Sequence, residues 1–348
     1  MAGSGFGTNF RITTWGETHG AGVGVVVDGC PAGLPLERED VQKYLDRRKP
    51  GQSKYTTQRK EGDQVEILSG IFEGRTTGTP ISMVVYNKDQ RSKDYSNIKD
   101  IYRPGHADFT FDMKYGFRDY RGGGRSSGRE TIGRVAAGAV AAKVLKELGI
   151  EIKAYAKAIA GIEVSKEHFD FAEMNNNPFN MPDKEAAKLV QEKADQMIKE
   201  MDSIGGIIEC QITGMPVGIG ETVFDKLDAE LSKAIMSIGS VKGFEIGDGF
   251  EAANLRGSEN NDDFICVDGK IEKETNHSGG VLGGMSDGSA IVFRAAIKPT
   301  PSIAQTQKTV NRDLDNVEIE IHGRHDPMIV PRAVVVVESM AAVTILDG

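Results

Sequence analysis

Hydrophobic positions repeat with two periods along the chain, and the changes of period mark the predicted elements. Apolar residues spaced three and four apart predict helices over residues 36–48, 131–148, 183–201 and 225–238. Runs rich in valine and isoleucine predict strands over residues 23–27, 65–68, 81–86, 207–212, 290–297, 317–321 and 333–337. Asp225 is the expected N-cap of its helix, and residues 339–346 predict a short terminal helix.

This succession predicts an α+β fold, with layers of helices packed against mainly antiparallel sheets. No Pro- or Ser-rich linker interrupts the 348 residues, so we expect one large domain over residues 1–348. Pro31-Ala32-Gly33 and Pro216-Val217-Gly218 each follow an apolar strand and precede a helix. The repetition indicates a duplicated strand–loop–helix unit.

The composition of the chain limits the kinds of partner that the protein is expected to bind. A net charge of −9 argues against a nucleic-acid-binding protein. The apolar runs are too short to span a membrane, and no signal peptide is evident, so we expect a cytoplasmic protein without membrane attachment. Cys30, Cys210 and Cys266 lack metal-ligand spacing. We expect all three to be reduced, buried side chains and predict no metal site.

Basic residues nevertheless gather in two islands, which suit a site for small anions. The first comprises Lys43, Arg47, Arg48, Lys49, Lys54, Arg59 and Lys60. The second comprises Arg103, Arg118, Arg121, Arg125, Arg129 and Arg134. A solvated charged surface is an equally good interpretation of the first island taken alone.

The segment Arg121–Arg129 is the densest block of glycine, and it leads directly into the helix predicted from Thr131. Glycine lets backbone N–H groups approach a ligand, and a helix N-terminus favours anions. Ser126 and Ser127 add hydroxyl donors, while Arg125 and Arg129 add planar forks for phosphate or carboxylate. The segment matches neither a Walker A loop nor a dinucleotide-binding fingerprint. It predicts an anion site of another kind.

Three further segments carry candidate chemistry. His19 and His106 lie in glycine-flanked loops and could move protons near neutral pH, although an isolated histidine is more often structural. Paired glycines in Asn276–Gly288, followed by Lys298–Ser302, suit a flat ring lying against the backbone, or a structural turn. Gly323–Pro327 places an arginine and a carboxylate in one turn, where a simple ion pair is the ordinary outcome.

Together these segments resemble the chorismate synthase family. The resemblance extends from Thr13 to Met340, across nearly the whole chain. Its strongest parts are Gly16–Gly20, Arg103–Asp108, Lys114–Arg134, Asn276–Gly284 and Gly323–Pro327. Five long motifs in the same order are far more specific than any one of them.

The resemblance implies conversion of 5-enolpyruvylshikimate 3-phosphate to chorismate by anti-1,4-elimination of phosphate. It also implies a need for reduced FMN without net redox change, NADPH as an indirect reductant, an external flavin reductase and a homotetramer. Because substrate and FMN are both highly anionic, several fixed cations must surround them.

The family pattern also assigns residues. The implied catalytic residues are His19, His106 and Asp326. The implied substrate contacts are Arg48, Arg103 and Arg129. The implied cofactor contacts are Arg48, Lys54, Arg125, Ser126, Ser127, Gly239, Ser240, Gly283, Lys298, Pro299, Thr300, Pro301, Ser302 and Arg324. Arg48 and Lys54 belong to the dinucleotide contact and the others to the flavin.

The chain departs from the family pattern at three of these places. Lys54 stands where arginine is frequent and lacks its bidentate fork. Gly239-Ser240 replaces a pair that often contains asparagine, and Pro301 interrupts a stretch usually richer in serine. These changes weaken the details of the cofactor list and leave the enzyme class intact.

Two other functions are compatible with the arginine- and glycine-rich loops. A flavin- or nucleotide-dependent dehydrogenase would show net redox change, and the missing GxGxxG fingerprint disfavours it. A non-catalytic phospholigand-binding protein would not need His19 and His106 beside the arginine loops. Phosphate release with and without reduced FMN distinguishes all three.

Overall fold

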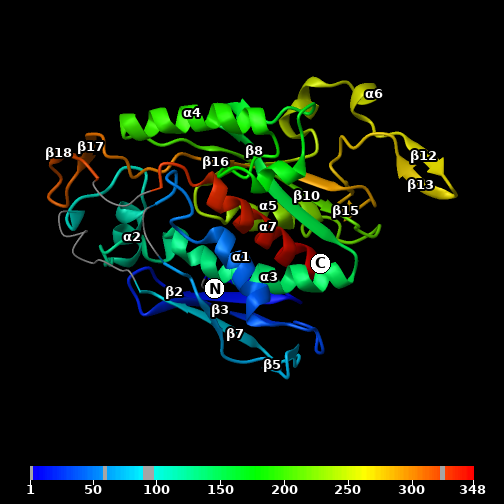
Figure 1. Ribbon diagram of the computed structural model, residues 1–348, viewed down its shortest axis with the longest axis horizontal. Helices are drawn as coiled ribbons and strands as arrows, with labels where there is room; N and C mark the ends of the chain where they lie inside the picture. The colour runs from blue at the N-terminus through cyan, green and yellow to red at the C-terminus, as the bar shows by residue number, and fades with distance from the viewer. Residues whose placement is uncertain (1–2, 58–60, 89–97, 322–325) are drawn as a thin grey trace.

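Two antiparallel sheets enclose a layer of helices in the computed structural model, which describes residues 3–57, 61–88, 98–321 and 326–348 (Figure 1). The first sheet has the order β1-β2-β3-β7-β4 and the second β11-β16-β10-β8-β9. The strands of the first are β1 Gly5–Phe6, β2 Arg11–Gly16, β3 Gly22–Asp28, β4 Val65–Ile67 and β7 Ile81–Tyr86. Those of the second are β8 Glu151–Ile159, β9 Ile162–Glu163, β10 Gly206–Thr213, β11 Val241–Ile246 and β16 Ile291–Ile297.

Four helices fill the space between the sheets (Figure 1). They are α1 Arg38–Arg48, α3 Thr131–Glu147, α5 Leu227–Met236 and α7 Val330–Asp347. Helix α3 packs on β2, β3 and β7, whereas α7 packs on β8 and β10. Helix α4, Lys184–Glu200, covers the outer face of the second sheet (Figure 1). The arrangement confirms the predicted α+β class with antiparallel sheets.

The two halves of this core repeat the same construction. Strands β2-β3-β7-β4 lie in the same order as β8-β10-β16-β11. Short hairpins, β5 Ile71–Phe72 with β6 Arg75–Thr76 and β14 Val281–Leu282 with β15 Met285–Ser286, occupy equivalent places.

Hydrogen bonds repeat as well. Thr76 Oγ1 donates to the Pro31 carbonyl at 2.6 Å, as Ser286 Oγ does to Pro216 at 2.6 Å. The same oxygens accept from the N–H groups of Leu34 and Ile219. The predicted duplication is therefore confirmed, and it includes the two proline–glycine turns that suggested it.

The strand predicted over residues 333–337 is wrong, because these residues belong to α7. Four consecutive valines resemble a buried strand, but nearly every residue of α7 is buried between the two sheets. A helix buried on all sides has no polar face, so its sequence lacks the amphipathic period that would identify it.

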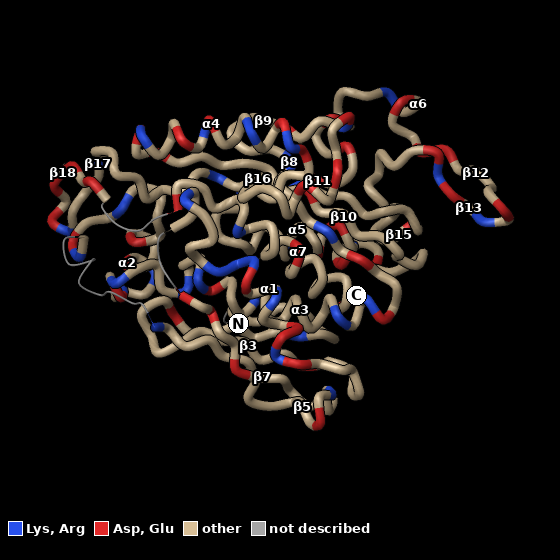
Figure 2. The backbone as a smooth tube through the Cα atoms, viewed as in Figure 1, with Lys and Arg blue, Asp and Glu red and all other residues tan. Residues whose placement is uncertain are grey.

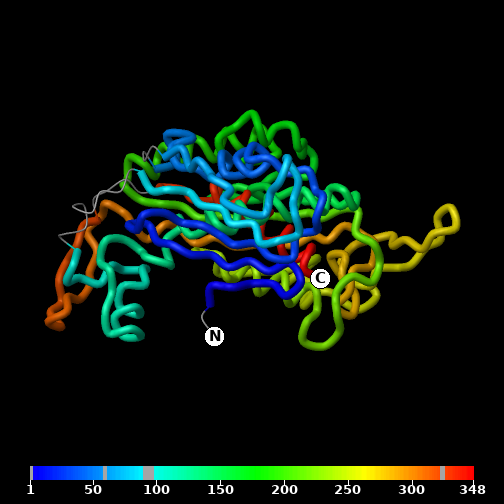
Figure 3. The backbone as a smooth tube through the Cα atoms, turned by 90° about the horizontal axis from the view of Figure 1, so that it is seen from below, coloured from blue at the N-terminus to red at the C-terminus, as the bar shows by residue number. Residues whose placement is uncertain are grey.

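Smaller expectations also need correction. Helix α5 begins after Lys226, and Asp225 does not cap it. Cys30 and Cys210 are buried free thiols as expected, whereas Cys266 is exposed. Cys266 lies in β12, Phe264–Val267, which pairs with β13, Lys270–Lys273, in an arm projecting from the body (Figures 1 and 3).

The hydrophobic pattern does not predict α2, Asp108–Tyr115, or the four-residue helix α6, Gly257–Asn260. The pair β17 Gln307–Val310 and β18 Asn316–Ile319 lies near α2 (Figures 1 and 3). Across the ranges described above, no helix is long and apolar enough to cross a membrane.

The two central helices approach most closely at Gly138. A Cβ at this position of α3 would lie 2.5 Å from the Cα and 2.8 Å from the carbonyl oxygen of Ser339 in α7. Only a residue without a side chain lets the helix backbones reach this separation.

Gly138→Ala is expected to lower the free energy of unfolding by about 1–3 kcal/mol, because the added methyl group forces α3 and α7 apart. This cost exceeds the roughly 0.5–1 kcal/mol that alanine gains in a helix. Urea unfolding measures the change. Gly257→Ala is the control, since a Cβ there meets nothing within 4 Å. Equal stability of the two variants would contradict tight packing at Gly138.

Candidate functional site

The glycine-rich segment forms two single turns before α3. Gly124–Ser126 and Gly128–Glu130 are 3₁₀ turns, and Ser127 between them accepts the N–H of Arg129. A Cβ added at Gly124 or Gly128 would meet nothing within 4 Å. The backbone therefore faces open space beside the entrance to an inner helix, which is a suitable place for an anionic ligand.

Arg125 ties this segment to the loop that carries His19. Its guanidinium donates to the Gly16 carbonyl at 3.1 Å and to the Thr14 carbonyl and hydroxyl at 3.0 and 2.7 Å. The Thr14 hydroxyl in turn donates to Glu130 at 2.8 Å. These bonds fix the loop relative to the start of α3.

His19 lies directly against the glycine-rich segment. Gly122 has φ of +114°, and a Cβ there would lie 3.1 Å from His19 Cδ2. Asn87 supports the same loop, since its amide donates to the carbonyls of Glu17 and Gly20 at 2.9 and 2.8 Å. The Asn87 oxygen accepts from Arg129 Nε at 2.5 Å. The structure thus brings His19, Arg125 and Arg129 into one neighbourhood.

Arg48 and Arg129 form the buried centre of the site. Both donate to Asp63, Arg48 Nη1 to Oδ2 and Arg129 Nη1 to Oδ1, each at 2.9 Å. Arg48 also donates to the Thr131 hydroxyl at 3.1 Å and to the Gly128 carbonyl at 2.9 Å. Burial, with nearby Arg332 and Arg129, lowers the pKa of Arg48 to about 10 against the pull of Asp63. Arg48 therefore remains charged near neutral pH.

Asp326 joins this cluster through Arg332. Arg332 Nε donates to the Arg48 carbonyl at 3.0 Å, and its Nη1 lies 2.5 Å from Asp326 Oδ2. The other oxygen of Asp326 accepts the N–H of Thr57 at 2.7 Å. The expected partner Arg324 lies outside the described residues, so the Arg324–Asp326 pair stays untested. Two hydrogen bonds, both made by Arg332, therefore connect Asp326 to Arg48, although the two residues are far apart in the sequence.

His106 belongs to a second group. Its Nε2 lies 2.8 Å from Ser302 Oγ and its Nδ1 lies 2.9 Å from the Pro104 carbonyl. Lys298 Nζ donates to the Gly105 carbonyl at 3.1 Å, and Lys298 N–H donates to the Ser240 carbonyl at 2.9 Å. The catalytic candidate His106 and two of the segments predicted to contact flavin are therefore neighbours.

The rest of the Lys298–Ser302 stretch is held in place locally. A Cβ at Gly105 would lie 2.6 Å from Pro301, and the Thr300 carbonyl accepts from the Ser203 hydroxyl at 2.7 Å. Pro299 precedes Thr300 and packs near Gly205. A Cβ at Gly239 would meet nothing within 4 Å, so this position also faces open space.

Arg103 pairs inside the protein. It donates through Nε and Nη2 to both oxygens of Asp108, each at 2.8 Å, and Arg118 lies 3.0 Å from the same carboxylate. Burial opposes ionisation of Asp108, but hydrogen bonding to Arg103 outweighs it and lowers the pKa of the carboxyl. This ion cluster fixes the loop of His106 by closing its two ends.

Two predicted cofactor contacts lie apart. Lys54 Nζ pairs with Asp195 at 2.8 Å, and 63% of the Lys54 side chain is exposed. Gly283 lies in the turn between β14 and β15, at the opposite end of the molecule from α2 (Figures 1 and 3). Ser126 is exposed and Ser127 half-buried at the glycine-rich segment.

Sequence reasoning missed Glu61, Asp63, Asn87 and Arg332, which organise the arginines. Figure 2 shows acidic positions beside basic ones near α1. Asp63 pairs with Arg48, the last residue of that helix, at 2.9 Å. The available signal was the pair of carboxylates just after the first basic island. A run of basic residues that must be buried needs carboxylates nearby.

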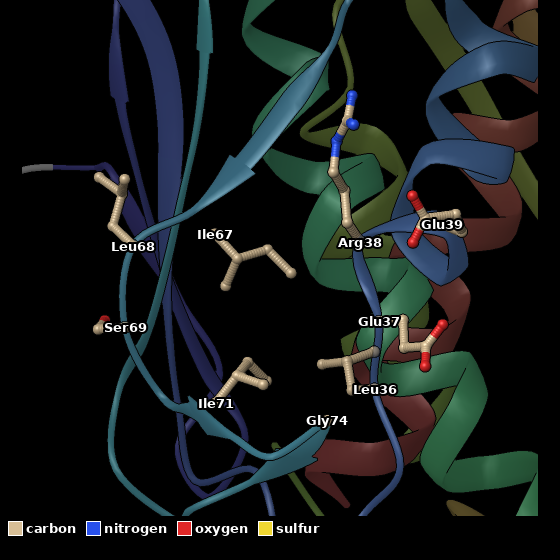
Figure 4. Close-up of a pocket in the computed structure, with 9 residues that line it drawn as sticks. All are labelled: Leu36, Glu37, Arg38, Glu39, Ile67, Leu68, Ser69, Ile71 and Gly74. Atoms are coloured by element: carbon tan, nitrogen blue, oxygen red, sulfur yellow. The ribbon is translucent and has the colours of Figure 1, made fainter.

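A groove on the described surface lies elsewhere, between the start of α1 and the segment that runs from β4 through β5 (Figure 4). Leu36, Ile67 and Ile71 line it, with Glu37 and Glu39 at the edge. It contains none of the predicted site residues. Among the residues with described positions, no group of His, Cys, Asp and Glu side chains could hold a metal ion.

The fold and this cluster define a class of protein: two sheets around a helical layer, with buried arginines at the inner helix ends that suit a small anion. The family model for chorismate synthase matches residues 10–348, and the chain belongs to the chorismate synthase family.

Proteins named chorismate synthase from Lachnospira eligens and Agathobacter rectalis are 69% and 66% identical to it; each comparison covers 100% of this chain and 95% of the relative. A crystal structure of chorismate synthase is 30% identical, with a TM-score of 0.78, and the match covers 98% of this chain and 92% of that one.

Asp108→Asn is expected to lower the free energy of unfolding at pH 7 by about 3–5 kcal/mol, because Arg103 and Arg118 lose their buried counter-ion. A depressed carboxyl pKa stabilises the fold above the unfolded pKa of about 3.9, and this contribution is lost as pH falls through the folded value. Unfolding of the variant should therefore depend less on pH below about 4. Denaturation followed across pH 3–7 measures both effects.

The matched control is Asp195→Asn, which removes the exposed partner of Lys54 and should leave stability and its pH dependence nearly unchanged. Equal behaviour of the two variants would contradict a special role for the Asp108 cluster.

Proposed function

We propose that residues 1–348 form one catalytic unit, a carbon–oxygen lyase that eliminates phosphate from 5-enolpyruvylshikimate 3-phosphate to give chorismate. The observation that carries this proposal is the convergence of His19, Arg48, Arg125, Arg129 and Asp326 at the ends of the inner helices. The reaction breaks a ring C–O bond to phosphate and a ring C–H bond, and the ring gains one double bond. The reaction belongs to the shikimate pathway of aromatic amino-acid biosynthesis.

The arginines bind and orient the substrate. Arg48 and Arg129 are buried, and Arg129 is positioned by Asn87 and Asp63 at the same time. A charged hydrogen bond to phosphate or carboxylate contributes about 1.5–3 kcal/mol. The substrate carries a phosphate and two carboxylates, so its binding requires several such donors. Arg103 has its guanidinium paired with Asp108 and acts here by holding the loop of His106.

The residues present fit reduced FMN. Open space faces Gly124, Gly128 and Gly239, and Lys298 and Ser302 supply a cation and a hydroxyl beside His106. Arg125, Ser126, Ser127, Ser240 and the 298–302 stretch, together with Arg324, would hold the cofactor. When bound, reduced FMN would supply an electron that loosens the C–O bond, without net redox change.

Three residues hold or move protons. His19, against Gly122 and beside the arginines, faces the departing phosphate and can protonate it. His106, between Ser302 Oγ and the Pro104 carbonyl, balances charge on the cofactor. Asp326, paired with Arg332, is the acceptor for the proton released during hydrogen removal.

The remaining features stay predictions: a homotetramer, a cytoplasmic location, NADPH as indirect reductant and an external flavin reductase. Lys54, exposed and paired with Asp195, suits at most a surface contact with a dinucleotide. A flavin contact by Gly283 requires a second subunit, because Gly283 and α2 lie at opposite ends of one chain.

The purified protein is expected to release inorganic phosphate from 5-enolpyruvylshikimate 3-phosphate only when reduced FMN is present, since the ring C–O bond needs the cofactor's electron. A phosphate assay under anaerobic conditions, with oxidised FMN and flavin-free reactions as controls, measures this. Equal release in all three reactions would contradict the mechanism. Net oxidation or reduction of the substrate would indicate a dehydrogenase instead.

His19→Ala and His106→Ala are each expected to bind FMN and substrate while turnover falls by about 10²–10⁴-fold, the usual contribution of acid–base catalysis. Steady-state rates at saturating substrate and separate binding titrations measure the two effects. His168→Ala, at an exposed histidine of the second half, serves as the control. Turnover near the wild-type rate would remove the tested histidine from the mechanism.

A further inference from the structure

We propose that Asp63 is a positioning residue that holds Arg48 and Arg129 together as one anion-binding unit, and that Glu61 is the counter-ion which the bound anion replaces. The inference rests on the proposed function, because it concerns arginines assigned there to the substrate. Asp63 and Glu61 are close together in the sequence, but their carboxylates make different contacts.

Asp63 is the point at which the two arginines meet. None of its side chain is exposed, and each of its oxygens accepts one guanidinium hydrogen bond of 2.9 Å. Two buried guanidinium groups repel each other and are costly to desolvate unless a carboxylate pairs with them. A single carboxylate bonded to both therefore fixes their separation and their relative orientation.

The backbone around Asp63 is held for this purpose by α1. Asp63 has φ of +43°, in the left-handed region that strains the backbone of a residue with a Cβ, although less for aspartate than for most. Gln42 of α1 donates to the Asp63 carbonyl at 3.2 Å and accepts the Val65 N–H at 3.0 Å. A strained conformation persists only where its surroundings fix it, so Asp63 occupies a specified position.

Glu61 makes a different kind of contact. Its Oε2 lies 2.6 Å from Arg129 Nη2, and the pair is buried. Arg129 Nη2 nevertheless has no aligned hydrogen-bond acceptor within the described part of the chain. Glu61 therefore neutralises Arg129 without satisfying this donor, which remains able to bind an oxyanion better placed than Glu61.

The net charge of the cluster indicates which carboxylate the bound anion replaces. Arg48 and Arg129 carry two positive charges, and Asp63 and Glu61 carry two negative ones, so the four groups together are neutral. A phosphate approaching this quartet gains little net attraction. Displacing Asp63 would release both arginines, whereas displacing Glu61 leaves the pair braced and adds one positive charge. The anion thus takes the place of Glu61 at Arg129 Nη2.

Calorimetric titration without flavin tests this on the full chain, using inorganic phosphate and 5-enolpyruvylshikimate 3-phosphate as separate probes. Asp63→Asn should weaken binding of both by about tenfold or more, because the two arginines lose their shared brace. Glu61→Gln should tighten binding by about three- to tenfold, because a neutral side chain no longer competes. Glu66→Gln, on the exposed side of β4, should leave both affinities unchanged.

The two substitutions are expected to change the binding affinity in opposite directions. If Glu61→Gln leaves affinity unchanged or weakens it, or if Asp63→Asn binds as tightly as wild type, the inference is wrong. Should Asp63→Asn fail to fold in a thermal melt, Glu61→Gln alone decides. Wild type that binds neither probe would also overturn the inference. Phosphate binding with the expected signs, but none of the enolpyruvyl substrate, would contradict only the proposed function.

Discussion

The burial of two arginines against one carboxylate is the constraint on which the site depends. Arg48 ends α1, Arg129 precedes α3, and Asp63 lies between them on the segment leading to β4. Desolvated guanidinium groups need fixed partners, so these three elements cannot move independently. Through Asn87 the same pair also fixes the loop of His19.

The duplicated architecture explains why this site lies where it does. Each half supplies an inner helix, α3 or α7, that follows a strand of its own sheet, and the segments before both helices carry site residues. The first half contributes Arg125 and Arg129, and the second contributes Asp326. Close packing of α3 on α7 at Gly138 brings the two segments together. The halves have diverged around this core, because only the second is covered by α4 and extended by the β12–β13 arm.

The two clusters of buried ion pairs at the site have different roles. Arg103, Arg118 and Asp108 form a buried, closed set in which the carboxylate receives bonds from both arginines, so its role is to hold the loop of His106. The Arg48–Arg129 cluster retains a donor that is neutralised without being satisfied. This difference separates a structural arginine from one available to a ligand, although both types occur in equally basic stretches of sequence.

Helices α3 and α4, the strands of both sheets that alternate or run apolar, and the motifs that place the chain in its family could all be predicted from the sequence alone. Local signals sufficed there because periodicity and turn residues act over a few positions. Other features depend on contacts that form only on folding. Burial on all sides made a helix of Val334–Val337, and only folding paired Arg103 with Asp108, left Lys54 exposed and set Asp63 between two arginines. These outcomes depend on which distant groups share a desolvated volume, and no local pattern records that.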